Sequence, residues 1–184
     1  MFTWSLFASS LFLVLTHLVP HATDIGFSAV EAATVLSLLG GTTTVGRVLM
    51  GTVSDRIGRK VTAIICVLLQ AGAMVWLIWA QELWMFYLFA LVYGFAYGGI
   101  SPSLAALIGD TFGIDRIGAI LGVLEVGFGV GAAIGPVMGG FIFDARNSYS
   151  MAFLIGAVVM LISTLLIALI RRETNRNFED GQSQ

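Results

Sequence analysis

The chain has 184 residues, of which 58% are hydrophobic and 11% are charged, and its formal net charge is −2. Soluble globular domains are roughly one quarter charged, so this composition lies outside their range. The weak charge, without a basic arm or an acidic tract, gives no reason to expect a nucleic-acid partner. The one cysteine, Cys66, cannot form a disulfide framework or a metal cluster.

Six stretches of the chain are long and apolar enough to cross a bilayer. A helix needs about 20 mainly apolar residues to span roughly 30 Å of hydrocarbon. We therefore predict an all-α membrane protein, with a polar tail at residues 171–184. The first stretch lacks the basic start and the cleavage site of a signal peptide. The predicted transmembrane helices lie at about residues 2–19, 30–50, 61–80, 83–106, 117–142 and 149–170.

The basic residues are distributed unevenly between the two sides of this arrangement. Seven of the nine lie in the second-to-third loop, the fourth-to-fifth loop and the tail, namely Arg56, Arg59, Lys60, Arg116, Arg171, Arg172 and Arg176. Loops rich in Lys and Arg stay cytoplasmic. We therefore expect a multi-pass protein of the plasma (inner) membrane, with both termini and the tail in the cytoplasm.

The segment between the second and third predicted helices reads Gly51-Thr-Val-Ser-Asp55-Arg56-Ile-Gly58-Arg59-Lys60. It resembles the G-x-x-x-D-R-x-G-R-R/K signature of the major facilitator superfamily, with every fixed position filled. In that family the acid helps to lock the cytoplasmic face by meeting a helix N-terminus, whose partial positive charge favours a carboxylate, and nearby cations. The resemblance implies a gating role for Asp55 and Arg56, with the three cations partly duplicating one another. The alternative is that the loop only fixes the topology.

A second element lies in the fifth predicted helix, where the chain reads Gly131-Ala-Ala-Ile-Gly135-Pro136-Val-Met-Gly139-Gly140. It is similar to the superfamily's G-x-x-x-G-P-x-x-G-G element, which is linked to antiporters. Proline removes a backbone donor and kinks a helix, while small residues let helices pack closely in lipid. Two interpretations stay open: a functional element of an antiporter, or a packing hinge. Gly94 and Gly98 form a similar small-residue pair in the fourth helix.

Members of this superfamily usually have twelve helices in two similar halves, and this chain has six. The segments His17-Leu-Val-Pro20-His21, Gly46-Arg47 and Tyr93-Gly94-Phe-Ala-Tyr97-Gly98-Gly99 resemble the second half of monocarboxylate and oxalate/formate-type carriers. The resemblance therefore implies the C-terminal six-helix half of a carrier. It would work with a complementary half or with a second copy of itself.

Arg47 is the strongest candidate for a substrate contact. It lies on a stripe of small and polar residues along the second helix, which comprises Ser37, Gly40, Thr44, Arg47, Gly51 and Ser54. An arginine inside a membrane helix should face the bundle interior or water, and its planar fork can bind a carboxylate with two hydrogen bonds. The resemblance implies the same role, because monocarboxylate carriers use the corresponding arginine for the substrate anion. The alternative is a snorkelling cation that joins the gating loop.

Glu125 occupies a similar depth in the fifth helix, about 12 Å from the cytoplasmic side. It could pair with Arg47, either as a fixed structural pair or as a group that exchanges a proton. Two departures from the related carriers weaken the assignment of a substrate. Thr43 stands where mammalian-type monocarboxylate carriers have an aspartate, and the fifth helix lacks the lysine of oxalate/formate-type carriers.

Three further residues are candidates for the transport path. His17 could face the cavity from the first helix, although a satisfied interfacial histidine is the alternative. Tyr93 and Tyr97 share one face of the fourth helix, where core packing is an equally good interpretation.

The leading hypothesis is secondary transport of a small organic anion such as a monocarboxylate, with or without a proton, by one half of a twelve-helix carrier. The sequence contains no nucleophile–base pair, metal-ligand spacing or nucleotide loop, so we expect neither an enzyme nor a cofactor. The alternatives are a truncated or structural six-helix protein and a homodimeric six-helix carrier.

The charge distribution generates a direct test of topology. A membrane-impermeant thiol reagent applied from outside should label a single cysteine placed near Asn147 and miss one placed near Gly58, because the basic loops stay inside. The reverse pattern of labelling would overturn the predicted orientation.

Overall fold

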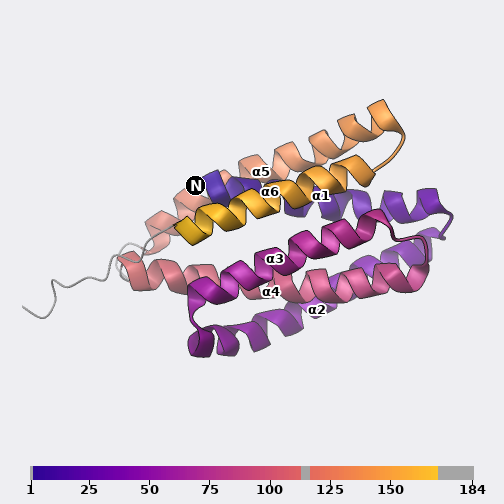
Figure 1. Cartoon of the computed structure of the whole chain (residues 1–184). Helices are drawn as coiled ribbons and strands as arrows, with labels where there is room; N and C mark the ends of the chain where they lie inside the picture. Colours follow the sequence, from indigo (N-terminus) through magenta and orange to yellow (C-terminus); the bar gives the residue numbers. More distant parts are fainter. Residues whose placement is uncertain (1, 113–116, 170–184) are drawn as a thin grey trace, which may run out of the picture.

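The computed structural model describes residues 2–112 and 117–169. The described residues form six α-helices and no strand, and all six helices are long and apolar enough to cross a membrane (Figure 1). This confirms the predicted all-α membrane architecture. The helices are α1 (Phe2–Ile25), α2 (Ala29–Ile57), α3 (Arg59–Ile78), α4 (Leu83–Phe112), α5 (Ile117–Arg146) and α6 (Ser150–Leu169).

Several helices extend beyond the predicted apolar stretches. α1 continues through Pro20 to Ile25, and α2 continues past residue 50 to Ile57. The apolar pattern marks the part of a helix that crosses hydrocarbon, whereas the backbone hydrogen bonds continue into the interface. The start of α2 is fixed by a capping box. In it, the Ser28 hydroxyl accepts from Glu31 N at 3.2 Å and the Glu31 carboxylate accepts from Ser28 N at 2.9 Å.

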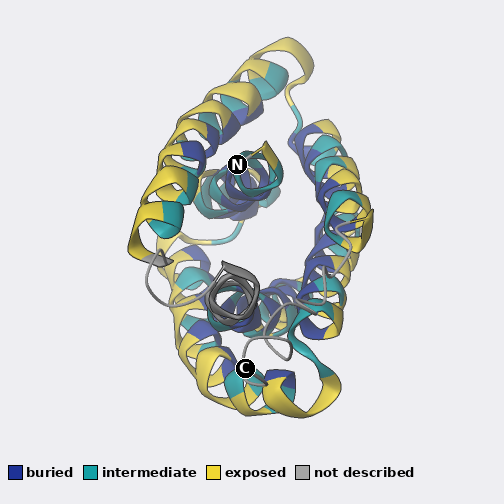
Figure 2. Ribbon diagram, turned by 90° about the vertical axis from the view of Figure 1, so that its left-hand side faces the viewer, coloured by how far each residue is buried: buried dark blue, intermediate teal, exposed yellow. Residues whose placement is uncertain are grey.

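The helices are paired closely along their lengths. α2 packs along α4 and α1 packs along α5, while α3 lies between α4 and α6. Figure 1 shows the start of α1 and the end of α6 at the same end of the bundle. Buried residues face inwards between the helices and exposed residues face outwards (Figure 2).

Glycines bring α5 into direct contact with the backbone of α1. A Cβ atom at Gly131 would collide with the carbonyl of Ser5, and one at Gly135 would collide with the carbonyl of Ser9. One α-helical turn further on, a Cβ at Gly139 would meet the imidazole ring of His17. This row therefore packs α5 against α1, as expected for small residues at a helix interface in lipid.

The contact between α2 and α4 uses glycines from both helices. A Cβ at Gly46 of α2 would meet the carbonyl of Phe95, and a Cβ at Gly98 of α4 would meet the carbonyl of Thr43. Gly94 lies in the same way against the Leu39 carbonyl. Both strong helix pairs are thus held by backbone-to-backbone approach.

The outer faces of α2 and α5 are the most open parts of the bundle. Within their membrane-crossing windows, 22% of the α2 residues and 17% of the α5 residues are buried, against 39% to 50% in the other four helices. Several glycines on these two helices have no atom near the position of a Cβ: Gly40, Gly41, Gly51, Gly118, Gly122, Gly129 and Gly140. Each of these two helices therefore has small residues on two faces. One face packs against a neighbouring helix, and the other has no described atoms against it.

This difference generates a matched pair of variants on α5. Gly135→Ala should destabilise the 184-residue chain by about 1–3 kcal/mol, because the added methyl group would have to displace the α1 backbone. Gly129→Ala meets open space and should be neutral or stabilising by up to about 1 kcal/mol, because alanine is the better helix former. Thermal unfolding in detergent measures both. Equal effects would show that close packing on α1 is unimportant.

Candidate functional site: the α2–α3 turn and the open face of α2

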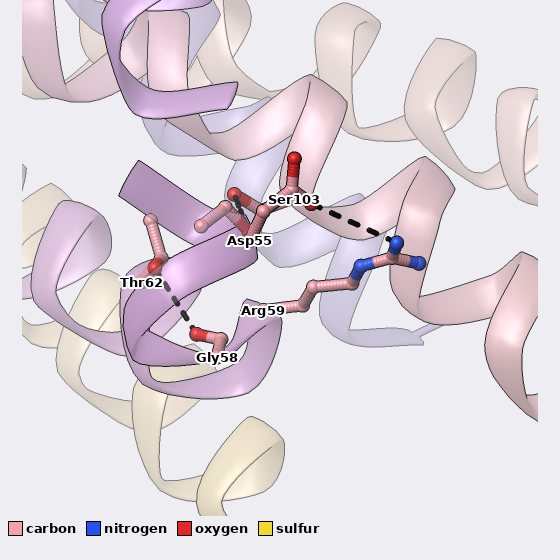
Figure 3. Close-up of polar contacts among 6 residues, drawn as sticks. Asp55, Gly58, Arg59, Thr62 and Ser103 are labelled. Carbon is pink, nitrogen blue, oxygen red and sulfur yellow. Dashed lines mark hydrogen bonds and ion pairs between the residues drawn. The ribbon is translucent and has the colours of Figure 1, made fainter. Parts of the chain in front are cut away.

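The connection between α2 and α3 is the single residue Gly58. It has a φ of 99°, a value that residues with a side chain rarely adopt. Its N–H donates to the Ser54 carbonyl at 3.1 Å, and its carbonyl accepts a 3.1 Å hydrogen bond from Thr62 Oγ1 (Figure 3). The motif glycine is therefore required by the abrupt reversal of the chain.

Asp55 lies in the last turn of α2, beside this reversal. Its Oδ1 is 3.8 Å from Nη2 of Arg59, and Figure 3 shows the two side chains extending toward one another. The Asp55 side chain is 69% exposed, so this ion pair should contribute less than about 1 kcal/mol. Within the described residues Asp55 accepts no backbone N–H. The family resemblance implies a helix N-terminus as a partner of Asp55. Such a partner would have to lie outside the described residues or in another conformation of the chain.

Lys60 has a different role from Arg59. Its Nζ donates a 2.7 Å hydrogen bond to the carbonyl of Ala168, in the last turn of α6. Carbonyls at a helix C-terminus lack intrahelical partners and carry a partial negative charge, so a cation there is favourable. Lys60 therefore ties the start of α3 to the end of α6, a contact that the sequence did not indicate.

The buried side of the same turn is held by two serines. Ser103 of α4 donates to the Gly99 carbonyl at 2.7 Å, and its Oγ lies 3.2 Å from Ser54 Oγ. Ser54 is only 3% exposed. The last member of the predicted polar stripe on α2 therefore faces α4 and not the open side.

The other members of that stripe form the open face of α2. Ser37, Gly40, Thr44 and Arg47 are all exposed. The Ser37 hydroxyl donates to the Ala33 carbonyl and the Thr44 hydroxyl to the Gly40 carbonyl, so each can still accept a hydrogen bond. Arg47 has no hydrogen bond or ion pair with another described residue. The open face thus presents one cation among small polar groups.

Glu125 is exposed on α5, and among the described residues it too has no ionic partner. The hypothetical pair with Arg47 is not formed in this structure. The reason is the helix pairing: α2 packs along α4 and α5 packs along α1, so the two charged faces belong to different pairs. Similar depth in the membrane does not place two residues side by side.

The aromatic candidates separate into a buried and a partly exposed residue. Tyr93 is 0% exposed and stacks on Phe89 at 5.0 Å between ring centroids, within the core. Tyr97 is half-buried and stacks on Phe7 at 6.3 Å. Of the two, only Tyr97 is accessible to a substrate in this conformation.

His17 is also buried, with 8% of its surface exposed. Its Nε2 lies 2.9 Å from the carbonyl oxygen of Pro136, and a carbonyl can only accept, so Nε2 carries the proton. In this conformation His17 therefore links α1 to the proline element of α5. The sequence pattern did not indicate this contact, which joins residues 119 positions apart.

The fold and the turn agree with a comparison against known families. The family model described as Major Facilitator Superfamily matches residues 1–183. The chain belongs to the major facilitator superfamily. With six candidate membrane spans, it is an integral multi-pass membrane protein of a transporter family.

Curated relatives in the superfamily include two kinds of transporter. Monocarboxylate transporter 13 of Rattus norvegicus is 29% identical over 161 residues, which cover 86% of this chain and 38% of that protein. Monocarboxylate transporter 12 of Xenopus laevis is 28% identical, covering 84% of this chain and 35% of that protein. Multidrug resistance protein MdtG of Klebsiella pneumoniae is 32% identical, covering 66% of this chain and 29% of that protein. The chain thus spans between 29% and 38% of the length of these relatives.

The geometry of the turn predicts that Asp55 matters for function more than for stability. Asp55→Asn should slow transport by the complete carrier, yet change the free energy of unfolding by less than about 1 kcal/mol, because the ion pair is exposed. Uptake per folded molecule and thermal unfolding measure the two effects. Arg56→Gln, which changes an exposed cation in the same turn, is the matched control and should have the smaller effect on uptake. Normal uptake by Asp55→Asn would leave the loop as a topology signal.

Proposed function

We propose that this chain is one half of a secondary carrier for a small organic anion, and that Arg47 contacts the anion. The carrier moves its substrate without chemical conversion, in the plasma membrane, with both termini in the cytoplasm. The observation that carries the proposal is the exposed guanidinium of Arg47, which pairs with no other described residue although its helix is apolar enough to cross a membrane.

The surroundings of Arg47 favour the interpretation that it faces a polar cavity and not lipid. A charged side chain in a membrane helix is costly unless it faces water, a partner or a ligand. The exposed hydroxyls of Ser37 and Thr44 lie on the same face, and Gly40 leaves space beside them. A carboxylate could take two hydrogen bonds from the guanidinium fork, with neighbouring polar groups completing its shell.

A complementary six-helix half is the partner that best explains the open faces of α2 and α5. Glycines such as Gly51 and Gly122 have open space where a Cβ would lie, and small residues at a lipid-exposed surface gain nothing from lipid contact. A substrate site between two halves would also place Arg47 away from lipid. A second copy of this chain is the alternative partner, since the same faces would then meet a like surface.

The similarity to monocarboxylate transporters favours an anion as substrate, because the matched stretch covers 86% of this chain and includes Arg47 in its α2 face. The similarity to MdtG covers only 66% of the chain and supports a transporter without indicating an anion. Thr43 stays consistent with either substrate class. Its hydroxyl donates to the Leu39 carbonyl at 2.8 Å and is buried against α4.

Substitution of Arg47 tests the anion contact. Arg47→Lys keeps the charge but loses the planar fork, so uptake of a labelled short-chain monocarboxylate should fall by at least about tenfold at subsaturating concentration, since a charge-assisted hydrogen bond contributes roughly 1.5–3 kcal/mol. Arg146→Lys, at an exposed arginine in the last turn of α5, is the matched control and should behave like the parent. Glu125→Gln in the same assay should flatten the pH dependence of uptake if its carboxylate carries a proton.

Uptake has to be measured per folded carrier, in the presence of the complementary half. If Arg47→Lys lowers only the amount of protein and leaves uptake per molecule intact, then Arg47 is a structural residue. If the parent exports a lipophilic drug but takes up no monocarboxylate, the chain is a drug carrier and the anion proposal is wrong.

A further inference from the structure

Two histidines lie together at the end of the bundle opposite the Asp55 turn. His17 and His21 are four residues apart in α1, and each is only 8% exposed. Tyr149, just before α6, contacts both rings, with centroid distances of 5.1 Å and 5.8 Å. Phe143 of α5 stacks on the other side of Tyr149 at 4.3 Å. This histidine cluster, made of His17, His21 and Tyr149, joins α1 to α5 and α6.

His17 holds α5 at its proline. Its Nε2–H donates to the Pro136 carbonyl, and its ring fills the space that Gly139 leaves by lacking a Cβ. Pro136 interrupts the hydrogen-bond ladder of α5, so the helix can bend there at low cost. Loss of the His17–Pro136 hydrogen bond would therefore leave α5 freer to bend at its proline.

His21 occupies an apolar box immediately beyond His17. Its ring centroid lies 5.6 Å from that of Phe86 in α4, 5.0 Å from that of Phe153 in α6 and 5.8 Å from that of Tyr149. The backbone carbonyl of Leu77 in α3 also faces the ring and can accept a hydrogen bond from it. The Nε2 atom of His21 is buried without a hydrogen-bond partner. A second proton on this ring would therefore place both a charge and an unpaired N–H in the box, which is unfavourable.

The carboxylate of Asp24 favours a protonated His21 both inside the box and outside it. Asp24, one turn further along α1, is exposed, and so is Asp144 of α5. Burial, and then the charges of Asp24 and Asp144, raise the pKa of the Tyr149 hydroxyl, so this neighbour stays neutral at physiological pH. A protonated His21 that moved toward water would meet the Asp24 carboxylate and solvent, whereas inside the box its Nε2–H would have no hydrogen-bond acceptor.

We propose that the histidine cluster is a proton-operated latch, which holds α1, α5 and α6 together at this end and opens when His21 is protonated. The role of the latch in opening a carrier rests on the proposed transport function. Its position on the outer side of the membrane rests on the predicted topology. Released into water, His21 would have the surroundings of an ordinary histidine, a side chain that titrates near neutral pH. Because the closed form binds fewer protons, it is favoured above that pH and is lost as the pH falls below it.

A distance measurement without substrate tests the latch separately from transport. Spin labels on Ala29→Cys and Ala145→Cys, both exposed positions at this end, report the separation of the α1–α2 connection from α5. Cys66 is buried and can stay in place. For the full chain in lipid nanodiscs, we expect a longer-distance population to grow severalfold between about pH 8 and about pH 5, a range that brackets the histidine pKa.

His21→Phe fills the aromatic box and cannot be protonated, so it should abolish the pH response. If that variant does not fold, His21→Gln serves the same purpose. Glu82→Gln is the matched control, since it removes an exposed carboxylate at the same end outside the cluster, and it should leave the response intact. Distances that do not change with pH in the parent, or a response that persists in His21→Phe and His21→Gln, would overturn the latch. Neither result depends on whether Arg47 binds an anion.

Discussion

Close approach of helix backbones is the constraint on which the rest of this fold depends. In lipid no hydrophobic effect drives helices together, so van der Waals contact and hydrogen bonds have to suffice. Gly131 and Gly135 bring α5 onto the carbonyls of α1, and Gly46 and Gly98 bring α2 onto α4. A single methyl group at any of these positions would separate a pair. α3 packs against α4 and α6, and α6 also packs against α1, which completes the bundle.

The pairing decides which polar groups remain available. Gly46 of α2 packs against α4, so the neighbouring residue, Arg47, points to the outside of the bundle. In the same way, Gly131, Gly135 and Gly139 of α5 pack against α1, and Glu125 lies on the exposed face of α5. The charges are therefore exposed as a consequence of packing and not by a separate arrangement. An assembly that covers these faces would bury both charges, so it has to supply compensating partners or a water-filled path.

The sequence was sufficient for the architecture and insufficient for most of the site. Apolar stretches about twenty residues long are local patterns, so they predicted the six spans and a connection within residues 51–60, which the structure narrows to Gly58. Periodicity also predicted the stripe on α2, but it could not show that Ser54 turns onto Ser103 while Arg47 stays open. The Lys60–Ala168 and His17–Pro136 contacts join residues 108 and 119 positions apart, and no local pattern contains that information. Matching depths for Arg47 and Glu125 likewise said nothing about which helices are neighbours.

The two ends of the bundle are held by different chemistry, and this difference has a mechanical consequence. At the turn end, the contacts are a hydrogen bond from Lys60 to the Ala168 carbonyl and an exposed ion pair between Arg59 and Asp55, which is weakened by salt. At the opposite end, aromatic packing surrounds two imidazoles, and histidine is the side chain whose ordinary pKa lies nearest to physiological pH. A carrier made of two such halves, as proposed here for this chain, would open its two ends alternately. With the proposed latch at the histidine end, it would respond to protons at that end. Pro136 of α5 contacts His17 of the histidine cluster. Bending of α5 at this proline would widen the bundle at the histidine end without breaking the contacts of Gly131 and Gly135 with α1.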